Sequence, residues 1–246
     1  MQLRRTYSRV PAGYYDRIYS WKQYALEAEA LKKLIRKYKR AKGMGLLDVA
    51  CGTGKHLQYL KGEFHCMGVD RSEHMLAQAR RNNPGIVFAP ADMVQLNLHA
   101  CFDTIICMFS SIGYVKTYPN LEKTIRNFYS HLNTGGVVII EPWFTRATFK
   151  KGVPHITTYG DDHTKIARLD VSNVRGGISV LDMHYLIAER NQAVKHYVDR
   201  HEIGMFESSR ILSSMKKAGF QAKLLRGKLN KTSREEDRGL FVGVKT

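Results

Sequence analysis

The chain has 246 residues, of which 43% are hydrophobic and 25% charged, a composition that supports a folded core and excludes a largely disordered protein. No apolar run approaches the roughly 20 residues that span a bilayer, and residues 1–10 lack the apolar segment of a secretory signal, so we expect no membrane association. The formal net charge is +17, and residues 1–42 carry twelve Lys/Arg against three Asp/Glu, which favours an anionic partner without assigning a function.

The first 141 residues alternate between helical and strand patterns. Residues 22–40 carry apolar side chains at helical spacing and basic side chains between them, which predicts an amphipathic helix. Short apolar runs predict strands at 46–50, 64–69, 86–89, 102–108 and 137–141. Helices are expected from Gly54, over 72–81 with Ser72 as the N-cap, and from about residue 119. Repeated β-α-β units with continuously apolar strands indicate a parallel sheet covered on both faces.

From about residue 150 the apolar pattern changes to a period of two. Segments 165–174, 178–187 and 194–205 alternate in this way, with turn residues at 175–177 and 190–193. These segments predict an antiparallel sheet inserted into, or attached to, the α/β body. A helix at 208–218 and strands at 221–225 and 239–244 return to that body.

The segment Leu46–Gly54 reads as a strand, a glycine-rich turn and the start of a helix, which is where α/β sheets bind nucleotides. It is not a P-loop, because Lys55 is followed by His56 rather than Ser or Thr. A dinucleotide fingerprint is incomplete, because Leu57 stands in the place of its third glycine.

The pattern Asp48-x-x-x-Gly52-x-Gly54 resembles the S-adenosylmethionine (AdoMet) loop of class I methyltransferases. The glycines would let the backbone pass close to a methionyl chain, and the acid would favour its ammonium group. The alternative is a structural turn with incidental acids.

Two further acids stand where an AdoMet site needs them. Asp70 ends the second strand, where a carboxylate can accept hydrogen bonds from both ribose hydroxyls. Asp92 and Met93 follow the third strand, where the acid can accept the adenine amino proton and the thioether can pack on the ring. We therefore predict AdoMet as the cofactor.

Five segments together resemble the AdoMet-dependent N,N-dimethyltransferases that act on dTDP-3-amino-3,6-dideoxyhexoses, from about residue 7 to residue 244. They are Leu47-Asp-Val-Ala-Cys-Gly-Thr-Gly, Ala91-Asp-Met, Cys107-Met-Phe-Ser-Ser-Ile-Gly-Tyr, Gly136-Val-Val-Ile-Ile-Glu-Pro-Trp-Phe and Arg238-Gly-Leu-Phe-Val-Gly. The resemblance implies a Rossmann-like class I methyltransferase fold of the α/β class, with a mostly parallel sheet and an antiparallel β insertion. It also implies a homodimer that N-methylates the amine of a small anionic acceptor, namely a nucleotide-linked amino sugar.

The resemblance also assigns roles to individual residues. Cofactor contacts fall on Tyr15, Tyr24, Ala50, Asp70, Asp92, Met93 and Met108. Acceptor contacts fall on Tyr7, Tyr114, Glu141, Trp143, Phe144, Arg168 and Arg238. We expect Tyr7 and Tyr114 to act in catalysis by orienting the amine through hydrogen bonds. Members of the family have His where this chain has Tyr114, so a group that titrates near neutral pH is missing from this position.

These assignments divide the chain into four parts. They are an N-terminal lid with a basic helix (1–42), an AdoMet-binding α/β core (43–149), an antiparallel subdomain for acceptor binding and dimerisation (150–206), and a C-terminal helix with strands that complete the core (207–246).

Other functions and sites carry less support from the sequence. The basic N-terminal helix would also suit a methyltransferase acting on RNA or another macromolecule, and a non-catalytic AdoMet-binding protein would keep the loop but lose the acceptor pocket. Residues His184, His196 and His201 show no metal-ligand spacing, so we expect no metal site. Four cysteines without disulfide-like spacing indicate a reducing, cytoplasmic compartment.

Overall fold

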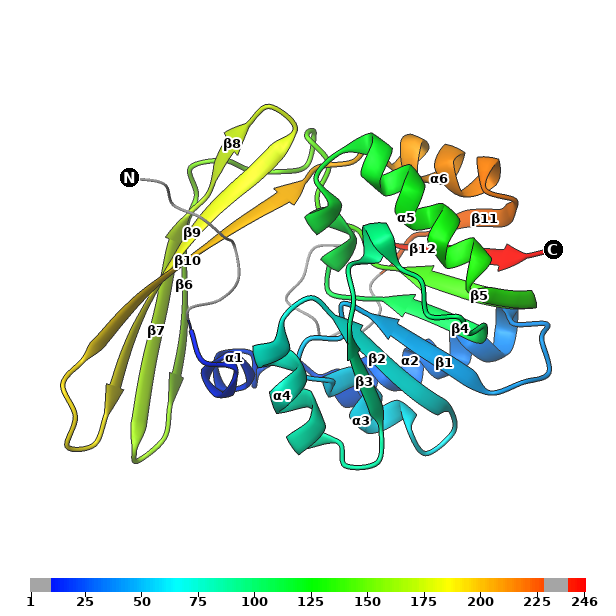
Figure 1. The fold of residues 1–246 in the computed structure, drawn as a ribbon. Coiled ribbons are helices and arrows are strands. Elements are labelled where there is room, and N and C mark those ends of the chain that lie inside the picture. Colours follow the sequence, from blue (N-terminus) through cyan, green and yellow to red (C-terminus); the bar gives the residue numbers. More distant parts are fainter. Residues whose placement is uncertain (1–9, 228–238) are drawn as a thin grey trace.

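The computed structural model describes residues 10–227 and 239–246 and contains two β-sheets, with a short helix between them (Figure 1). The predicted acceptor contacts Tyr7 and Arg238 lie outside the described residues. The larger sheet has seven strands in the order β11-β12-β5-β4-β1-β2-β3. Its strands are β1 (Gly45–Val49), β2 (His65–Asp70), β3 (Val87–Pro90), β4 (Phe102–Cys107), β5 (Leu132–Ile140), β11 (Phe220–Leu225) and β12 (Leu240–Lys245).

Pairings among β1 to β5 are parallel, whereas β12 runs antiparallel to both β5 and β11. The expected mostly parallel α/β fold is therefore confirmed. The helices and 3-10 turns of this body are α2 (Tyr24–Tyr38), α3 (Lys55–Leu60), α4 (Glu73–Asn82), η1 (Met93–Gln95), η2 (Ser111–Val115), α5 (Tyr118–Ser130) and α6 (Ser208–Lys217). As predicted, Ser72 caps α4 by accepting a hydrogen bond from the Met75 amide.

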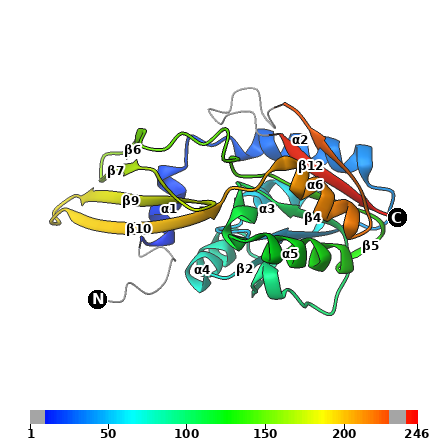
Figure 2. The same cartoon turned by 90° about the horizontal axis from the view of Figure 1, so that it is seen from above.

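Alternate residues of the central strands feed two apolar layers. Leu47 of β1 joins a buried cluster with Phe128 of α5 and Met215 of α6. Its neighbour Leu46 joins a second cluster on the other face, with Ile35 of α2. Figure 2 shows α5 and α6 on one side of the sheet and α2 on the other. Burial on both faces explains why these strands read as continuous apolar runs.

The second sheet has the order β10-β9-β7-β6, with β8 paired to β9. Its strands are β6 (Pro154–Gly160), β7 (Thr164–Val171), β8 (Asn173–Arg175), β9 (Ile178–Glu189) and β10 (Lys195–Gly204). The sequence prediction of one strand over 165–174 was wrong: the buried Ser172 turns to the Lys150 carbonyl, and the chain continues as β8. The prediction also missed β6, an edge strand with little burial and hence a weak apolar pattern.

Helix α1 (Ala12–Ile18) lies between the two sheets, in a segment not predicted to be helical (Figure 1). Asp16 accepts hydrogen bonds from Thr53 Oγ1 at 2.6 Å and Asn82 Nδ2 at 3.0 Å, both in the α/β body. The next residue, Arg17, donates a hydrogen bond of 2.7 Å to Thr164 Oγ1 of β7. The helix thus ties the body to the second sheet. None of the helices in the described ranges has the length and apolar character needed to cross a membrane.

Candidate active site

Two cavities meet beyond the carboxyl ends of the parallel strands, the position at which α/β sheets bind ligands. The first, of about 490 Å³, lies among the loops after β1, β2 and β3 and the 3-10 turn η2. The second, of about 580 Å³, lies between η2, the loop after β5 and the second sheet. Four residues line both cavities: Tyr15, Ser111, Tyr114 and His201. A small chamber of about 50 Å³ extends beside the first cavity.

The loop after β1 owes its shape to residues with positive φ. Ala50 has φ of 59° and Gly52 has φ of 56°, and a Cβ on Gly52 would meet nothing within 4 Å. Both residues line the first cavity. Gly54 lines none of the three cavities; with φ of 74° it precedes α3, and a Cβ there would lie 2.7 Å from Asn83 Nδ2. The structure therefore places Gly54 as a packing residue beside α4 rather than at the cavity.

Asp48 lies at the base of this loop and lines the small chamber. It is buried, and its Oδ2 atom has no hydrogen-bond partner within the described part of the chain. Burial, with a smaller contribution from the charge of Asp70, raises the pKa of Asp48 well above its usual range. A buried carboxyl oxygen without a donor is costly, so a ligand ammonium in the adjoining chamber would supply the partner it lacks. This property fits the methionyl end of AdoMet.

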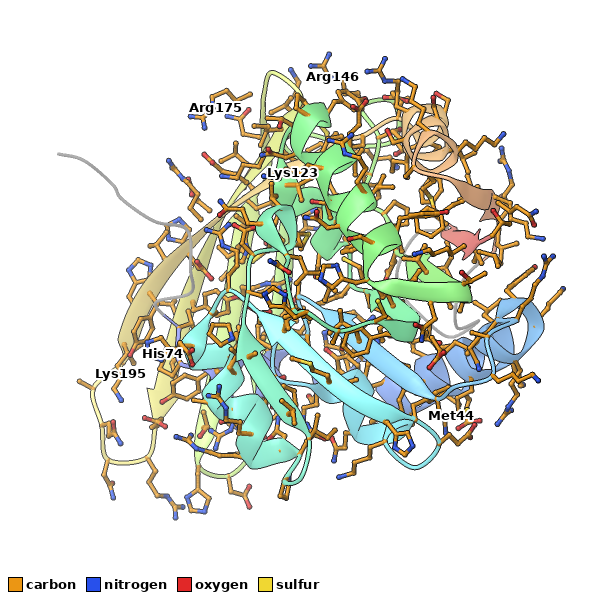
Figure 3. All side chains as sticks on the ribbon, turned by 45° about the vertical axis from the view of Figure 1, so that its right-hand side comes forward. Met44, His74, Lys123, Arg146, Arg175 and Lys195 are labelled. Carbon is orange, nitrogen blue, oxygen red and sulfur yellow. The ribbon has the colours of Figure 1, made fainter. Side chains whose placement is uncertain are left out.

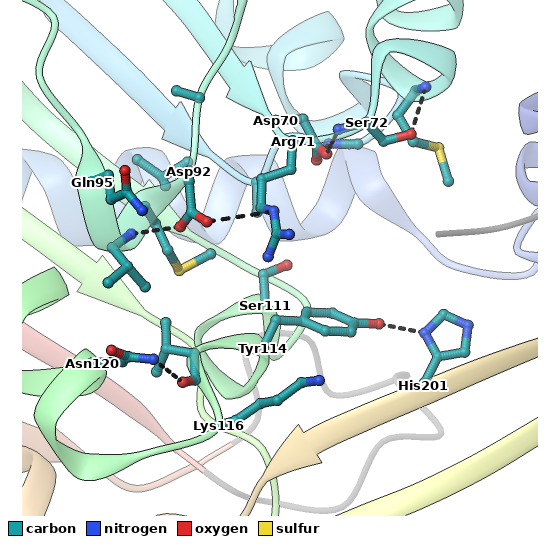
Figure 4. A pocket seen from close by; sticks show the side chains of 18 of the residues that line it. Asp70, Arg71, Ser72, Asp92, Gln95, Ser111, Tyr114, Lys116, Asn120 and His201 are labelled. Carbon is teal, nitrogen blue, oxygen red and sulfur yellow. Dashed lines mark hydrogen bonds and ion pairs between the residues drawn. The ribbon is translucent and has the colours of Figure 1, made fainter. Parts of the chain in front are cut away.

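Two other carboxylates line the first cavity (Figure 4). Asp70 accepts hydrogen bonds from the amides of Gly52 and Ser72, both at 2.9 Å. Burial nevertheless raises the pKa of Asp70, against the effect of these amides. Asp92 accepts a hydrogen bond from the Val94 amide at 2.8 Å, and its other oxygen lies 3.5 Å from Arg71 Nε. The carboxylates are thus held in place before any ligand arrives, as a ribose and an adenine amino group require.

The remaining predicted cofactor contacts also line these spaces. Met93 is buried against the first cavity, and Tyr24 and Met108 line the small chamber. Tyr15 borders all three spaces. Burial raises the pKa of Tyr15 well above its usual range, so its hydroxyl stays protonated and can donate a hydrogen bond.

Aromatic side chains and one arginine dominate the second cavity. The rings of Trp143 and Phe144 meet edge to face at 4.8 Å, and the indole N–H of Trp143 donates to Ser179 Oγ at 2.8 Å. Arg168 lies in the same wall, where it donates to the Tyr19 hydroxyl at 2.6 Å and to Thr157 Oγ1 at 3.0 Å. The guanidinium therefore has a fixed position.

The charge of Arg168 is maintained by its surroundings. Burial alone would lower its pKa, but Tyr19, Tyr185 and Asp170 raise the pKa above the usual value.

The predicted acceptor contact Glu141 is placed differently, since it lines none of the three cavities. Its Oε2 accepts a hydrogen bond of 2.6 Å from the amide of Phe109, a cavity residue with φ of 52°. Glu141 thus supports the wall from behind.

Sequence reasoning missed several residues that face the cavities, above all His201. Its Nδ1 atom lies 2.6 Å from the Tyr114 hydroxyl, although the two residues are 87 positions apart (Figure 4). No local signal could have found this pair, because it depends on how β10 packs against η2. Within 10–227 and 239–246, no group of three or more His, Cys, Asp or Glu side chains is arranged to hold a metal ion.

Comparison with known proteins agrees with this geometry. A family described as "Methyltransferase domain" matches residues 46–136. The chain is 35% identical to the dTDP-3-amino-3,4,6-trideoxy-alpha-D-glucopyranose N,N-dimethyltransferase of Streptomyces venezuelae, over 95% of this chain and 97% of the relative. Among solved structures, DesVI of Streptomyces venezuelae has a TM-score of 0.89 and 34% identity, and the match covers 98% of this chain and 100% of DesVI.

A further solved structure carries the cofactor. The amino pentose methyltransferase CalS10 of Micromonospora echinaspora, solved with S-adenosylmethionine bound, has a TM-score of 0.82 and 26% identity, with 100% of each chain covered. The AdoMet loop, the carboxylates around the first cavity and these similarities lead to one assignment. The chain belongs to the AdoMet-dependent methyltransferases, in the family of the dTDP-amino-sugar N,N-dimethyltransferases, and AdoMet is its cofactor.

Proposed function

We propose that the protein transfers methyl groups to the amine of a nucleotide-linked amino sugar. The observation that carries this proposal is the wall shared by the two cavities, formed by Tyr15, Ser111, Tyr114 and His201. AdoMet in the first cavity supplies an electrophilic methyl group. An amine held in the second cavity would meet that methyl group where the two cavities join, beside the hydroxyl groups of the shared residues.

The chain's own contribution to this reaction is mainly positioning. The hydroxyls of Tyr15, Ser111 and Tyr114 can orient the amine, and Tyr7 remains a proposed partner in this role. The aromatic walls of the second cavity exclude water from the acceptor. Holding two reactants in line is worth up to about 7–11 kcal/mol when the geometry is ideal.

The second cavity suits a sugar nucleotide in size and chemistry. Its volume of about 580 Å³ falls within the usual range for small-molecule sites. Trp143 and Phe144 offer flat apolar surfaces for a base or a sugar ring, and Arg168 offers a fixed positive charge for a phosphate. Arg238 remains a proposed second phosphate ligand. In addition, the relative from Streptomyces venezuelae is named as an N,N-dimethyltransferase of a dTDP-linked amino sugar.

The competing proposal, methylation of RNA, requires basic side chains that are free to follow a phosphate backbone. On α2, Lys32 Nζ lies 2.7 Å from Glu29 and 3.3 Å from Glu63, and Arg36 lies 2.6 Å from Glu63. Lys39 Nζ donates to backbone carbonyls. Other basic side chains come from separate parts of the sequence: Figure 3 labels Lys123 of α5, Arg146 of the loop after β5 and Arg175 of β8. On α2, these contacts leave fewer basic side chains free to follow a phosphate backbone.

A methyl-transfer assay with labelled AdoMet tests the proposal. Three acceptors are compared: a dTDP-linked amino sugar, the same sugar without the nucleotide, and RNA. We expect the nucleotide-linked sugar to be methylated in preference to both others, and mass spectrometry then gives the number of methyl groups. Reversing the exposed Lys33 and Lys37 to Glu should change this activity by no more than a few-fold. Label incorporated into RNA and lost in that variant would instead favour the macromolecular function.

We also propose that the protein is a homodimer that buries the outer face of the second sheet. Register and alternation place exposed apolar side chains on the face turned away from α1. They are Ile156, Leu169, Val171, Leu186, Val194 and Val198. Light scattering after gel filtration should give twice the chain mass, and Leu186→Lys with Val198→Lys should give a monomer.

The four cysteines, all free, support the proposal of a reducing compartment such as the cytoplasm.

A further inference from the structure

Three hydrogen-bonded side chains stand where the two cavities meet. The Tyr114 hydroxyl of η2 lies 2.6 Å from Nδ1 of His201 on β10 (Figure 4). Nε2 of the same imidazole lies 3.0 Å from Asp199 Oδ2. Tyr114 and His201 line both cavities. Asp199 is buried behind them, at 5% exposure. This chain of contacts leads from the shared wall into the protein.

The chemistry of Asp199 sets the direction of the hydrogen bonds. We infer that Asp199 is ionised and therefore only accepts, so that Nε2–H of His201 donates a hydrogen bond to it. In a neutral imidazole Nδ1 is then an acceptor, and the Tyr114 hydroxyl donates to it. A hydroxyl oxygen has two lone pairs, so the Tyr114 oxygen can also accept a hydrogen bond from an N–H group at the shared wall.

We propose that Tyr114, His201 and Asp199 form a relay that removes a proton from the ammonium form of the acceptor. This inference rests on the proposed function. An N–H bond of the ammonium breaks and its proton moves to the Tyr114 oxygen, while the hydroxyl proton of Tyr114 moves to Nδ1 of His201. The nitrogen keeps the electron pair of the broken bond, and Asp199 stabilises the imidazolium that forms. The His201 side chain, 21% exposed, then returns the proton to water.

Such a relay answers a requirement of amine methylation. Alkyl amines are protonated at neutral pH, as lysine shows, and a protonated nitrogen has no lone pair with which to attack a methyl group. Each methylation also produces a new ammonium, so a second transfer to the same nitrogen needs a second deprotonation. An imidazole that has passed one proton to water can accept the next, which resets the relay between transfers.

The other titratable groups around the relay are paired or neutral. Lys116, which follows η2, and Arg175 of β8 both pair with Glu202, at 2.7 and 2.6 Å. On the outer face of the sheet, Arg200 pairs with Asp182 through two contacts of 2.6 Å. Burial raises the pKa of Tyr15 on α1 and of Tyr185 on β9, which therefore stay protonated. Asp199 is thus the acid in direct contact with the imidazole.

The pH dependence of kcat/KM for the amino sugar tests the relay. At pH 7 we expect His201→Asn to lower kcat/KM by about 10²-fold or more, the usual contribution of a proton-transfer group. At pH 9 a larger share of the acceptor is already deprotonated, so the loss should shrink to a few-fold. Adding Tyr114→Phe to His201→Asn should cost little more, because the two residues act as a unit. His163→Asn, in an exposed turn of the same sheet, is the matched control.

A loss that stays constant from pH 7 to pH 9, or losses that multiply in the double variant, would overturn the relay and leave a packing role. Because Tyr114 and His201 also line the first cavity, AdoMet affinity is measured by calorimetry in each variant, and kcat/KM is compared at saturating AdoMet. A second readout needs no acceptor: nitrogen NMR of the histidine rings should show the Nε2–H form for His201. Finding the proton on Nδ1 would overturn the relay as well. If the wild-type enzyme methylated no amino sugar, the proposed function would fall, and the NMR result would still report on the hydrogen-bonded chain.

Discussion

Replacing Asp70 by Ala is expected to weaken AdoMet binding selectively. The carboxylate is held by the amides of Gly52 and Ser72 at 2.9 Å and lines the first cavity. In the complex it would accept hydrogen bonds from the ribose hydroxyls, and losing such a charged acceptor costs about 1.5–3 kcal/mol. The dissociation constant for AdoMet should therefore rise by about 10- to 150-fold.

The same carboxylate predicts how AdoMet affinity depends on pH. Burial raises the pKa of Asp70, so the protonated form appears at a higher pH than for an exposed aspartate. The ionised form is the better acceptor for the ribose, and affinity should be full at neutral pH and fall as the pH drops through the raised pKa. The variant Asp70→Ala should lack this acid limb.

Isothermal titration calorimetry at pH 7.5 and at lower pH measures both effects, and circular dichroism checks that the variant is folded. Glu73→Ala, which removes an exposed carboxylate at the start of α4, is the control and should bind AdoMet as the wild type does. An unchanged dissociation constant in folded Asp70→Ala, or an equal loss in the control, would refute the assignment of the first cavity to the ribose.

Three other predictions concern residues that support the site. Glu27→Gln should lower the free energy of unfolding by about 3 kcal/mol, since the buried carboxylate contacts Lys22 at 2.6 Å and His56 at 3.0 Å. Burial acts to raise the pKa of Glu27, but the contacts with His56 and Lys22 outweigh burial, and the pKa is lowered. The stabilisation by this carboxylate is therefore complete above about pH 4.3 and is lost as the pH falls through the lowered pKa. Thermal melts from pH 7 to pH 3 check this dependence. Gly54→Ala should cost about 2 kcal/mol in urea unfolding, because φ is 74° and the new Cβ would meet Asn83 Nδ2 at 2.7 Å; an unchanged midpoint would contradict it. Glu141→Gln should lower kcat/KM for the acceptor, because it weakens the 2.6 Å hydrogen bond that holds Phe109, a residue that lines both the second cavity and the small chamber; an unchanged kcat/KM would contradict this support.

Much of the α/β body was readable from the sequence. The strands buried on both faces are continuous apolar runs, and Ser72 marks the start of the helix predicted over 72–81 as its N-cap. The AdoMet-loop pattern is equally local, because Asp48, Gly52 and Gly54 fall within seven residues. These features depend on backbone preferences and periodicity over a few residues, which the linear sequence carries in full.

The second sheet and the cavity beside it were decided by tertiary structure. Edge strand β6 is too exposed to show a clear pattern, and the break between β7 and β8 depends on a hydrogen bond from Ser172 to Lys150. Contact between Tyr114 and His201 joins residues 87 positions apart and exists only because the second sheet packs beside η2. The sequence thus determined the fold class and the cofactor. The wall at which the two cavities meet arises from long-range packing, which no local spacing encodes.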